Sequence, residues 1–362
     1  MRTSIIYATK TPLPYPNAAS INIVQTCQTL AQLGYNSVLY NDWKPWRLTT
    51  LFHNVRKYYG IDRLSFDIHR VPPISTVYFH GLYHLARKMN AIVFTRDLST
   101  ASYTTHRGIP TILELHTSKN NSKDILALLE NSNLIKLLFI SQSLYDSYGL
   151  DNNDCRVSVY HDPVNPLRFS DIIVPDKTSC GYVGSSFPGK GLREIVIPLA
   201  LKNPDIEFHI AGISKRDIIK HSNKDVDLTN INAYGRIQPN RVPRIFNRFN
   251  IALLPNQPNI HLPNGTDIGA HTSPLKLFEY MAAGKAIVAS DIPVLREVLT
   301  HEYNALLIKH NHLDGWIEAI KRLKTDDKLF NRISAQAKND ALKYYSFEYR
   351  YSAILSEISV HP

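Results

Sequence analysis

The sequence predicts an α/β protein with two doubly wound domains, each built on a parallel sheet. Short apolar runs alternate with helix-period segments along the chain, which is typical of a parallel sheet covered on both faces. The proline-containing segment 161–166 divides these runs into two series and is typical of a linker. At 362 residues, the chain is also too long for one ordinary hydrophobic core.

The first series of apolar runs extends from residue 3 to about residue 160. Between its first two runs, residues 19–33 have helical periodicity and are followed by Gly34, which suits the position just after a helix. The series predicts one parallel sheet. Its expected strands are Ser4–Ala8, Ser37–Tyr40, Ala91–Phe94, Thr111–Leu115 and Leu137–Ile140.

The second series begins near Cys180 and shows the same alternation, so it predicts a second sheet. The tail, from about residue 313 to residue 359, is expected to be helical with a break at Tyr345 and Ser346. The expected strands of this series are Gly181–Val183, Glu207–Ala211, Ala233–Gly235, Ile251–Leu254, Ala286–Ala289 and Ala305–Ile308.

Composition and charge narrow the class of protein. The hydrophobic fraction of 44% and the charged fraction of 20% are those of a globular protein. The net charge of +10 suits an anionic membrane or substrate; without zinc-finger spacing, an RNA-recognition strand or a glycine–arginine tract, no nucleic-acid partner is expected. Cys27, Cys155 and Cys180 show no metal-ligand spacing and no pairing pattern. With no signal-peptide core and no apolar run of about 18 residues, we expect a cytoplasmic location.

The stretch 273–291 has the clearest local pattern in the chain. Ser273 suits a helix N-cap, Pro274 the first helical position and Gly284 the residue after the end, and a short buried strand follows. The helix is apolar nearly all round, which predicts burial, yet it carries Lys276 and Glu279 three residues apart. A buried carboxylate needs a partner. An internal ion pair and a ligand site are both compatible with this pattern.

Other candidate residues lie in loops that follow predicted strands, where ligands bind in such sheets. The segment 184–191 is rich in small residues and contains Lys190, so a phosphate cradle and an ordinary loop are both possible interpretations, although it is not a Walker motif. His116 follows one strand, and residues 9–18 follow another. A long loop, 255–272, precedes the helix.

Aromatic and basic side chains alternate from Trp43 to Tyr59. Such a segment could lie on an anionic membrane surface. A helix edge with basic side chains lying over the core explains the pattern equally well.

Several of these segments, in chain order, form a larger pattern. They are Leu115–Ser118, Val159–Phe169, Gly181–Gly184, Lys190–Leu192, Phe208–Gly212, Tyr234–Ile237, Ile251–Pro255 and Ser273–Asp291. Together they resemble the retaining glycosyltransferases of the large bacterial family 4, nearly end to end. The last segment is similar to the family's signature in the version Ser-Pro-x-Lys-x-x-Glu-Tyr-Met-Ala.

The resemblance implies a GT-B fold, in which two Rossmann-like domains face a central cleft. Residues 1–163 would form the acceptor-side domain, with a C-terminal helix of about residues 346–362 packed back on it, and residues 164–345 would bind the nucleotide sugar. The implied reaction is retaining transfer from a nucleotide-diphosphate sugar to a glycan, glycolipid or lipid-linked acceptor in cell-surface polysaccharide synthesis. It requires no metal and no other cofactor. A peripheral position at the inner face of the membrane is a further expectation.

The resemblance also implies roles for particular residues. Glu279 would accept hydrogen bonds from the ribose, Lys190 would neutralise the diphosphate, and His116 would contact the sugar and diphosphate; these three are the expected catalytic residues. The expected acceptor-side loop contains Asn17, Ala18 and Ala19. The expected donor-binding residues are Gly184, Ser185, Lys190, Gly212, Arg236, His271, Thr272, Ser273, Leu275, Lys276 and Glu279.

Two positions depart from the family pattern. Ser185 stands where an arginine is frequent, so diphosphate binding would depend more on Lys190. His271 stands where a sugar-binding glutamate is usual, which leaves His271, Thr272 or Asp267 as candidates for that contact. Two alternatives stay open: a sugar-nucleotide 2-epimerase of the same fold, and a non-catalytic carbohydrate- or membrane-binding relative.

Overall fold

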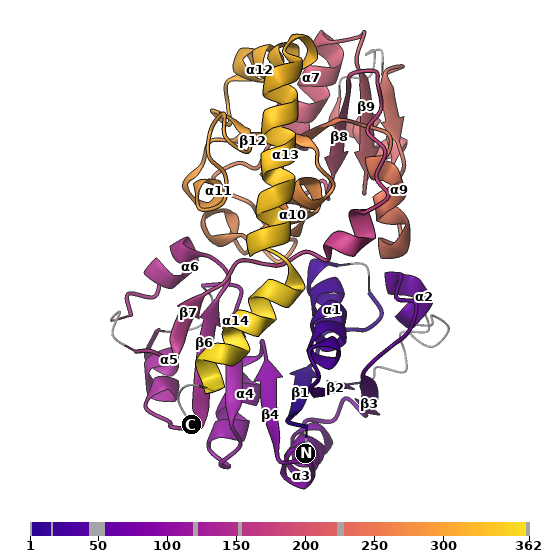
Figure 1. Cartoon of the computed structure of the whole chain (residues 1–362). Helices are drawn as coiled ribbons and strands as arrows, with labels where there is room; N and C mark the ends of the chain where they lie inside the picture. The colour runs from indigo at the N-terminus through magenta and orange to yellow at the C-terminus, as the bar shows by residue number, and fades with distance from the viewer. Residues whose placement is uncertain are drawn as a thin grey trace. The chain divides into compact units, whose positions relative to one another are not determined.

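The computed structural model describes residues 2–15, 17–42, 55–118, 122–150, 154–222 and 228–359. The chain divides into two compact units (Figure 1). Unit 1 contains residues 1–163 and 347–362, and unit 2 contains residues 164–346. The aromatic and basic segment proposed to contact a membrane lies largely outside the described residues, because only its end, from Val55 to Tyr59, belongs to them.

Unit 1 is a doubly wound parallel sheet with helices on both faces. Across its described residues the sheet has seven strands in the order β3-β2-β1-β4-β5-β6-β7, and the direction of winding reverses between β1 and β4. The strands are β1 Ser4–Thr9, β2 Asn36–Asp42, β3 Asp67–Val71, β4 Ala91–Thr95, β5 Thr111–Leu115, β6 Leu134–Phe139 and β7 Val157–Val159. The helices are α1 Ala18–Gln32, α2 Val55–Tyr59, α3 Ser75–Met89, α4 Leu98–Thr105, α5 Ser122–Leu129, α6 Gln142–Asp146 and α14 Phe347–Ser359.

The two faces of this sheet bury alternate residues of β1, as the period of a strand requires. Ile5 and Tyr7 belong to a core that contains side chains of α1 and α14. Ile6 and Ala8 belong to a separate core against α3. Figure 1 shows α14, in yellow, with the elements of unit 1, so the last helix of the chain completes a core that the first strand begins.

Unit 2 repeats the architecture. Among its described residues six parallel strands follow the order β10-β9-β8-β11-β12-β13, and the winding reverses between β8 and β11. The strands are β8 Ser179–Val183, β9 Glu207–Ala211, β10 Ile231–Ala233, β11 Ile251–Leu254, β12 Ala286–Ser290 and β13 Leu306–Ile308. The helices are η2 Pro166–Phe169, η3 Leu192–Val196, α7 Ile197–Lys202, α8 Lys215–His221, η4 Pro239–Arg241, α9 Val242–Phe246, η5 Gly269–His271, α10 Leu275–Ala282, α11 Pro293–Arg296, α12 Leu313–Thr325 and α13 Asp327–Tyr344.

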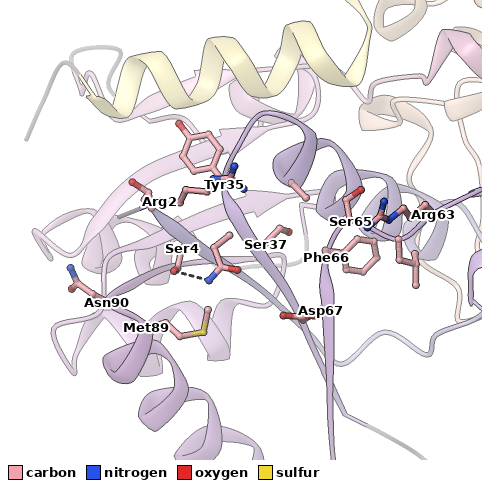
Figure 2. Close-up of a pocket in the computed structure, with 14 residues that line it drawn as sticks. Arg2, Ser4, Tyr35, Ser37, Arg63, Ser65, Phe66, Asp67, Met89 and Asn90 are labelled. Carbon is pink, nitrogen blue, oxygen red and sulfur yellow. Dashed lines mark hydrogen bonds between the residues drawn. The ribbon is translucent and has the colours of Figure 1, made fainter.

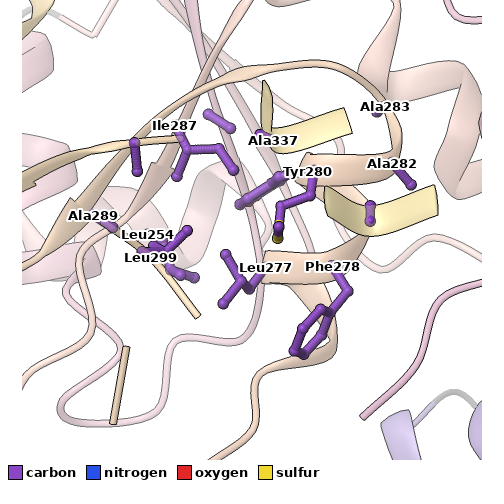
Figure 3. Close-up of a cluster of buried hydrophobic side chains, with 14 of the residues drawn as sticks. Leu254, Leu277, Phe278, Tyr280, Ala282, Ala283, Ile287, Ala289, Leu299 and Ala337 are labelled. Carbon is purple, nitrogen blue, oxygen red and sulfur yellow. The ribbon is translucent and has the colours of Figure 1, made fainter. Parts of the chain in front are cut away.

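The helix α10 lies in the middle of one core of unit 2. Leu277, Phe278 and Tyr280 pack with side chains of β11, β12 and α13 (Figure 3). The prediction of a buried helix is therefore confirmed. Its predicted start was wrong by one residue. Pro274, expected at the first helical position, has extended backbone angles and is itself the N-cap, so the helix begins at Leu275.

The predicted pair of doubly wound sheets is confirmed, and the bounds of each predicted strand lie within three residues of those of an observed one. Two further strands, β3 and β7, were not predicted. Both lie at the edges of the sheet of unit 1, and neither contains a fully buried residue, so neither shows the apolar run that marks a buried strand.

Candidate functional site

The reversal of winding places the loops after β8 and β11 at the ligand-binding position of a doubly wound sheet. The helix α10 follows the loop after β11. The side chain of Tyr280, which belongs to this helix, ties it to the end of β8. The backbone N–H of Val183, the last residue of β8, donates a hydrogen bond of 2.8 Å to the hydroxyl of Tyr280. This bond fixes the helix against the carboxyl end of the central strand.

Glu279 is the buried charge at this position, with only 2% of its surface exposed. Lys276, one helical turn earlier, donates a short hydrogen bond to Oε2 of the carboxylate. Arg168, from η2, places its Nη1 3.7 Å from Oε1. The predicted pairing of Lys276 with Glu279 is thus present, and a second cation, which the sequence analysis did not identify, faces the other oxygen.

The loop 184–191 carries Lys190, and no carboxylate in the described part of the chain lies within ion-pairing distance of this lysine. Burial lowers the pKa of Lys190 to about 8. An amine in these surroundings gains free energy from an anionic ligand that replaces the missing counter-charge. Ser185, in the same loop, accepts a hydrogen bond of 2.7 Å at its carbonyl from the hydroxyl of Tyr182.

Two predicted glycines meet where β8 and β9 end. A Cβ atom on Gly212 would lie 2.1 Å from the carbonyl oxygen of Gly184, and Gly212 has a φ of +100°. The backbone N–H of Gly184 donates to Ala211 at 3.0 Å, and that of Gly212 donates to Gly235 at 2.7 Å. The sequence needs glycine at position 212 because no side chain fits between the two strand ends.

The long loop before α10 contains the predicted sugar-contacting candidates. Asp267 is used by the loop itself, since it accepts hydrogen bonds from Asn259 Nδ2 at 2.7 Å and from the backbone N–H groups of Ile260 and Gly269 at 2.9 and 2.8 Å. These bonds hold the pKa of Asp267 below its usual range, the bond from Gly269 contributing most. His271 ends the short helix η5, and Thr272 is buried behind it.

The remaining predicted residues of unit 2 differ in exposure. Ser273 is buried directly before α10, and Leu275 begins the helix. Arg236 lies beyond β10 with an exposed side chain. The structure therefore groups Gly184 with Gly212 and Lys276 with Glu279, and it records no contact for Arg236 among the residues it describes.

In unit 1, the predicted residues follow β1 and β5. Asn17 is the N-cap of α1 and accepts a hydrogen bond of 2.8 Å from the N–H of Ser20. Ala18 and Ala19 form the first turn of that helix. His116 lies directly beyond β5, at the carboxyl edge of the same sheet. Asn17 and His116 lie in strand-to-helix loops, whereas Ala18 and Ala19, which were predicted in the loop, belong to helix α1.

His116 belongs to a buried ionic network that the sequence did not reveal. Its Nε2 lies 2.5 Å from Oε1 of Glu114, which is fully buried. Arg96 Nη2 lies 2.8 Å from the same oxygen, and Arg350 Nη2, from α14, lies 2.7 Å from Oε2. Burial alone would raise the pKa of Glu114, but Arg350, Arg96 and His116 together hold it well below its usual range.

A signal for some of the missed residues was present in the sequence. Glu114 and His116 are two residues apart at the end of a strand, so they project to the same face. Arg168 lies within the segment Val159–Phe169 that carries part of the family resemblance. Arg350 gives no such signal, because 236 residues separate it from Glu114.

A cavity of about 1030 Å³ lies at the opposite edge of the unit 1 sheet (Figure 2). Ser4, Asn36 and Asp67, at the amino ends of their strands, line it together with Arg2 and Arg63. None of the predicted site residues lines this cavity. It is therefore a feature separate from the strand-to-helix loops.

Two kinds of feature are absent from the described ranges. No cluster of three or more His, Cys, Asp and Glu side chains there could hold a metal ion. None of the helices in those ranges combines the length and apolarity that crossing a membrane requires.

Most of unit 2 matches a known protein family. Residues 166–340, just under half of the chain, match the family model described as "Glycosyl transferases group 1". This segment is therefore similar to glycosyltransferase group 1 domains. The segment contains β8 to β13, α10 and the Lys276–Glu279 pair. No curated protein sequence matched the chain.

Solved structures show the same fold over nearly the whole chain, including the segment that the family model matches. HepE from Anabaena, in complex with UDP and glucose, has a TM-score of 0.71 at 11% identity over 98% of this chain and all of HepE. Sucrose-phosphate synthase from Thermosynechococcus elongatus has a TM-score of 0.72 at 12% identity, with full coverage of both chains. A TarM structure from S. aureus gives 0.71 at 10% identity over 99% of this chain and all of that one. The fold is GT-B.

Proposed function

We propose that this protein is a retaining, metal-independent glycosyltransferase of the family 4 type. It moves a sugar from a nucleotide-diphosphate sugar to a glycan, glycolipid or related acceptor, in the synthesis of cell-surface polysaccharide. The match to the group 1 family model supports glycosyl transfer, and neighbours in complex with UDP support a nucleotide-sugar donor. A cytoplasmic location, peripheral at the membrane, belongs to the same proposal.

One observation carries the proposal. The buried side chain of Glu279 lies at the ligand-binding edge of the sheet, and only one of its two carboxylate oxygens accepts a hydrogen bond from the described residues. Oε2 of Glu279 is used by Lys276, whereas Oε1 accepts no hydrogen bond from any residue that the structure describes. A carboxylate oxygen that accepts no hydrogen bond within the protein can accept one from a ligand. The hydroxyl groups of a ribose are donors of this kind.

The diphosphate of the donor is assigned to Lys190 and to the start of α10. Lys190 is a cation without a counter-charge among the described residues, and the first backbone N–H groups of a helix, here Leu275 and Lys276, have no partner within the helix. Both features favour an anion.

During transfer, the bond between the anomeric carbon and the diphosphate oxygen breaks, and the bond to the acceptor oxygen forms on the same face of the sugar. The acceptor hydroxyl loses its proton, and the diphosphate leaves with the bonding electron pair. Negative charge develops on the diphosphate, and Lys190 is placed to stabilise it. His116 is assigned to the sugar and diphosphate; its Nε2 is held by Glu114, so Nδ1 is the ring nitrogen that remains for this role.

The test is turnover by purified protein with a panel of nucleotide sugars and glycan or lipid-linked acceptors. We expect Glu279→Ala and Lys190→Ala each to lower kcat/KM by about tenfold to a hundredfold or more, because each removes charged hydrogen bonds of about 1.5–3 kcal/mol. Full activity of both variants would contradict the site assignment. Glu318→Ala is the matched control, since this glutamate lies on α12 with 61% of its side chain exposed.

The same assay separates the alternatives. An epimerase converts the donor without any acceptor, and a non-catalytic relative binds nucleotide sugar without turnover. The anomeric configuration of the product, measured by NMR before mutarotation, tests retention. Inversion would reject the family 4 type.

The lowered pKa of Lys190 predicts how binding of a nucleoside diphosphate depends on pH. The amine is charged below its pKa of about 8 and neutral above it. Affinity should therefore be highest below pH 8 and fall as the pH rises through and above that value, by about tenfold for each 1.4 kcal/mol of lost attraction. Bound diphosphate favours the charged amine and so raises the pKa of Lys190 in the complex; the fall in affinity should therefore begin near pH 8 and level off above that higher pKa.

Calorimetric titration of UDP, GDP or ADP between pH 6.5 and pH 9.5 measures this dependence, with Lys190→Arg as the control. A guanidinium stays charged throughout this range, so the arginine variant should show a much flatter profile. Identical slopes for the two proteins would show that a different group titrates.

A further inference from the structure

Arg168 is a buried cation of unit 2 to which the proposed function gives no role. It lies on η2, and 11% of its side chain is exposed. Its Nη2 donates a hydrogen bond of 2.6 Å to the carbonyl oxygen of Pro239, the first residue of η4. Its Nη1 points to Glu279 on α10. One guanidinium thus connects three segments that are far apart in the sequence.

The contact between Arg168 and Glu279 is not a hydrogen bond. Nη1 and Oε1 are 3.7 Å apart, and N–H···O bonds span about 2.7–3.2 Å. The structure records no hydrogen bond for Nη1 or for Oε1 within the ranges it describes. Nη1 can therefore still donate a hydrogen bond and Oε1 can still accept one, and the two atoms lie side by side.

A hydroxyl group suits such a pair, because it donates one hydrogen bond and accepts others at the same oxygen. A carboxylic acid or phosphate would place negative charge beside Oε1. An amine would place positive charge beside Nη1. The charges of the two residues therefore select a neutral ligand group that is both donor and acceptor.

We propose that Arg168 binds the ribose of the donor nucleotide together with Glu279. One ribose hydroxyl donates its hydrogen to Oε1 of Glu279 and accepts a hydrogen bond from Nη1 of Arg168. Arg168 thereby makes the site selective for ribonucleotides over deoxyribonucleotides. This inference rests on the proposed function, since it takes the ribose to be the ligand of Glu279.

The other role open to Arg168 is to neutralise Glu279 and to tie η2 to η4 without touching a ligand. Burial lowers the pKa of Arg168, and Glu279 opposes that effect, so the two side chains already favour each other in the free protein. The two roles differ in one respect. A structural role affects every nucleotide equally, whereas a ligand contact affects only nucleotides that carry the hydroxyl.

The experiment measures the dissociation constants of a nucleoside diphosphate and of its 2′-deoxy and 3′-deoxy forms by calorimetry. The base is the one that binds best among UDP, GDP, CDP and ADP. The wild-type protein should prefer the ribonucleotide over at least one deoxy form by about tenfold to a hundredfold, because deletion of that hydroxyl removes its hydrogen bonds to two charged side chains.

Arg168→Met should weaken binding of the ribonucleotide about tenfold and leave binding of that deoxy form nearly unchanged, so the preference shrinks. Arg168→Lys, which keeps a donor, should restore part of the preference. Arg244→Met is the control for removal of a cation from the same unit, because Arg244 is exposed on α9. Thermal melting of each variant establishes that it is folded.

The outcomes separate this inference from the proposed function. If Arg168→Met weakens all three nucleotides by the same factor, or none of them, the ribose contact is rejected. If Glu279→Gln removes the preference but Arg168→Met does not, Glu279 binds the ribose without Arg168, and only this inference fails. If no nucleoside diphosphate binds, or Glu279→Gln leaves both affinity and preference intact, the proposed function fails with it.

Discussion

Replacing Glu114 with glutamine is expected to lower the free energy of unfolding of unit 1 by about 3–5 kcal/mol. The substitution replaces the carboxylate that lies closest to the buried Arg96 and Arg350 with a neutral amide, and leaves Asp162 as a more distant counter-charge for both arginines. His116 also loses the charge of the partner that its Nε2 contacts. The cost arises because the two arginines stay buried and poorly hydrated. The attraction of the carboxylate that offset this desolvation penalty is then missing.

Urea denaturation at neutral pH measures this effect. Asp205→Asn is the control, because the Asp205–Lys324 pair is exposed and such pairs contribute less than about 1 kcal/mol. Combining Glu114→Gln with Arg350→Met should cost less than the sum of the two single changes. A loss below 1 kcal/mol for Glu114→Gln would show that water or another group compensates the arginines.

The pH dependence gives a second, independent check. The pKa of Glu114 is held well below its usual range in the folded protein. Its contribution to stability is therefore complete above the unfolded value of about 4.3 and is lost as the pH falls toward the folded value. The difference between wild type and Glu114→Gln should be constant near neutral pH and shrink in acid.

The second large effect is expected at Gly212. Alanine there would place a methyl group 2.1 Å from the carbonyl oxygen of Gly184, at a φ of +100°. Backbone strain of about 1–2 kcal/mol and overpacking of about 1–3 kcal/mol together predict a loss of about 2–5 kcal/mol in the stability of unit 2. Nucleotide binding should weaken as well, because the ends of β8 and β9 must separate.

Gly235→Ala separates the two causes. Gly235 also has a positive φ, of +64°, but a Cβ atom there would have no heavy atom within 4 Å. Only the backbone strain applies, so we expect a loss of about 1–2 kcal/mol. Equal losses of stability for the two variants would mean that the ends of β8 and β9 move apart at little cost in free energy.

Most of the strands that the sequence predicted have buried, apolar residues. All five residues of β8 and all five of β12 are buried, and a continuous apolar run is visible in the sequence without knowledge of the fold. β3 has exposed residues at three of its five positions and resembles a loop in composition. Edge strands of this kind owe their conformation to the neighbouring strand, which a local pattern does not contain.

The residues of the candidate site likewise include some that the sequence could predict and some that it could not. Lys276 and Glu279 could be paired from the sequence because three residues separate them on one helix. The partners that complete each site, Arg168 for Glu279 and Arg350 for Glu114, come from distant segments. Spacing shows which charges need a partner, but only the folded chain shows which partner each receives.

The position of α14 has a consequence for synthesis on the ribosome. Residues 1–163 emerge first, yet their core and their Glu114 network lack the side chains of residues 347–359 until the whole of unit 2 has been made. At about 5–20 residues per second, this interval is roughly 10–40 seconds. Unit 2, which is contiguous, can fold during that time, so the part of the protein that is translated first is expected to be finished last. Until then the surface that α14 will cover is open to chaperones.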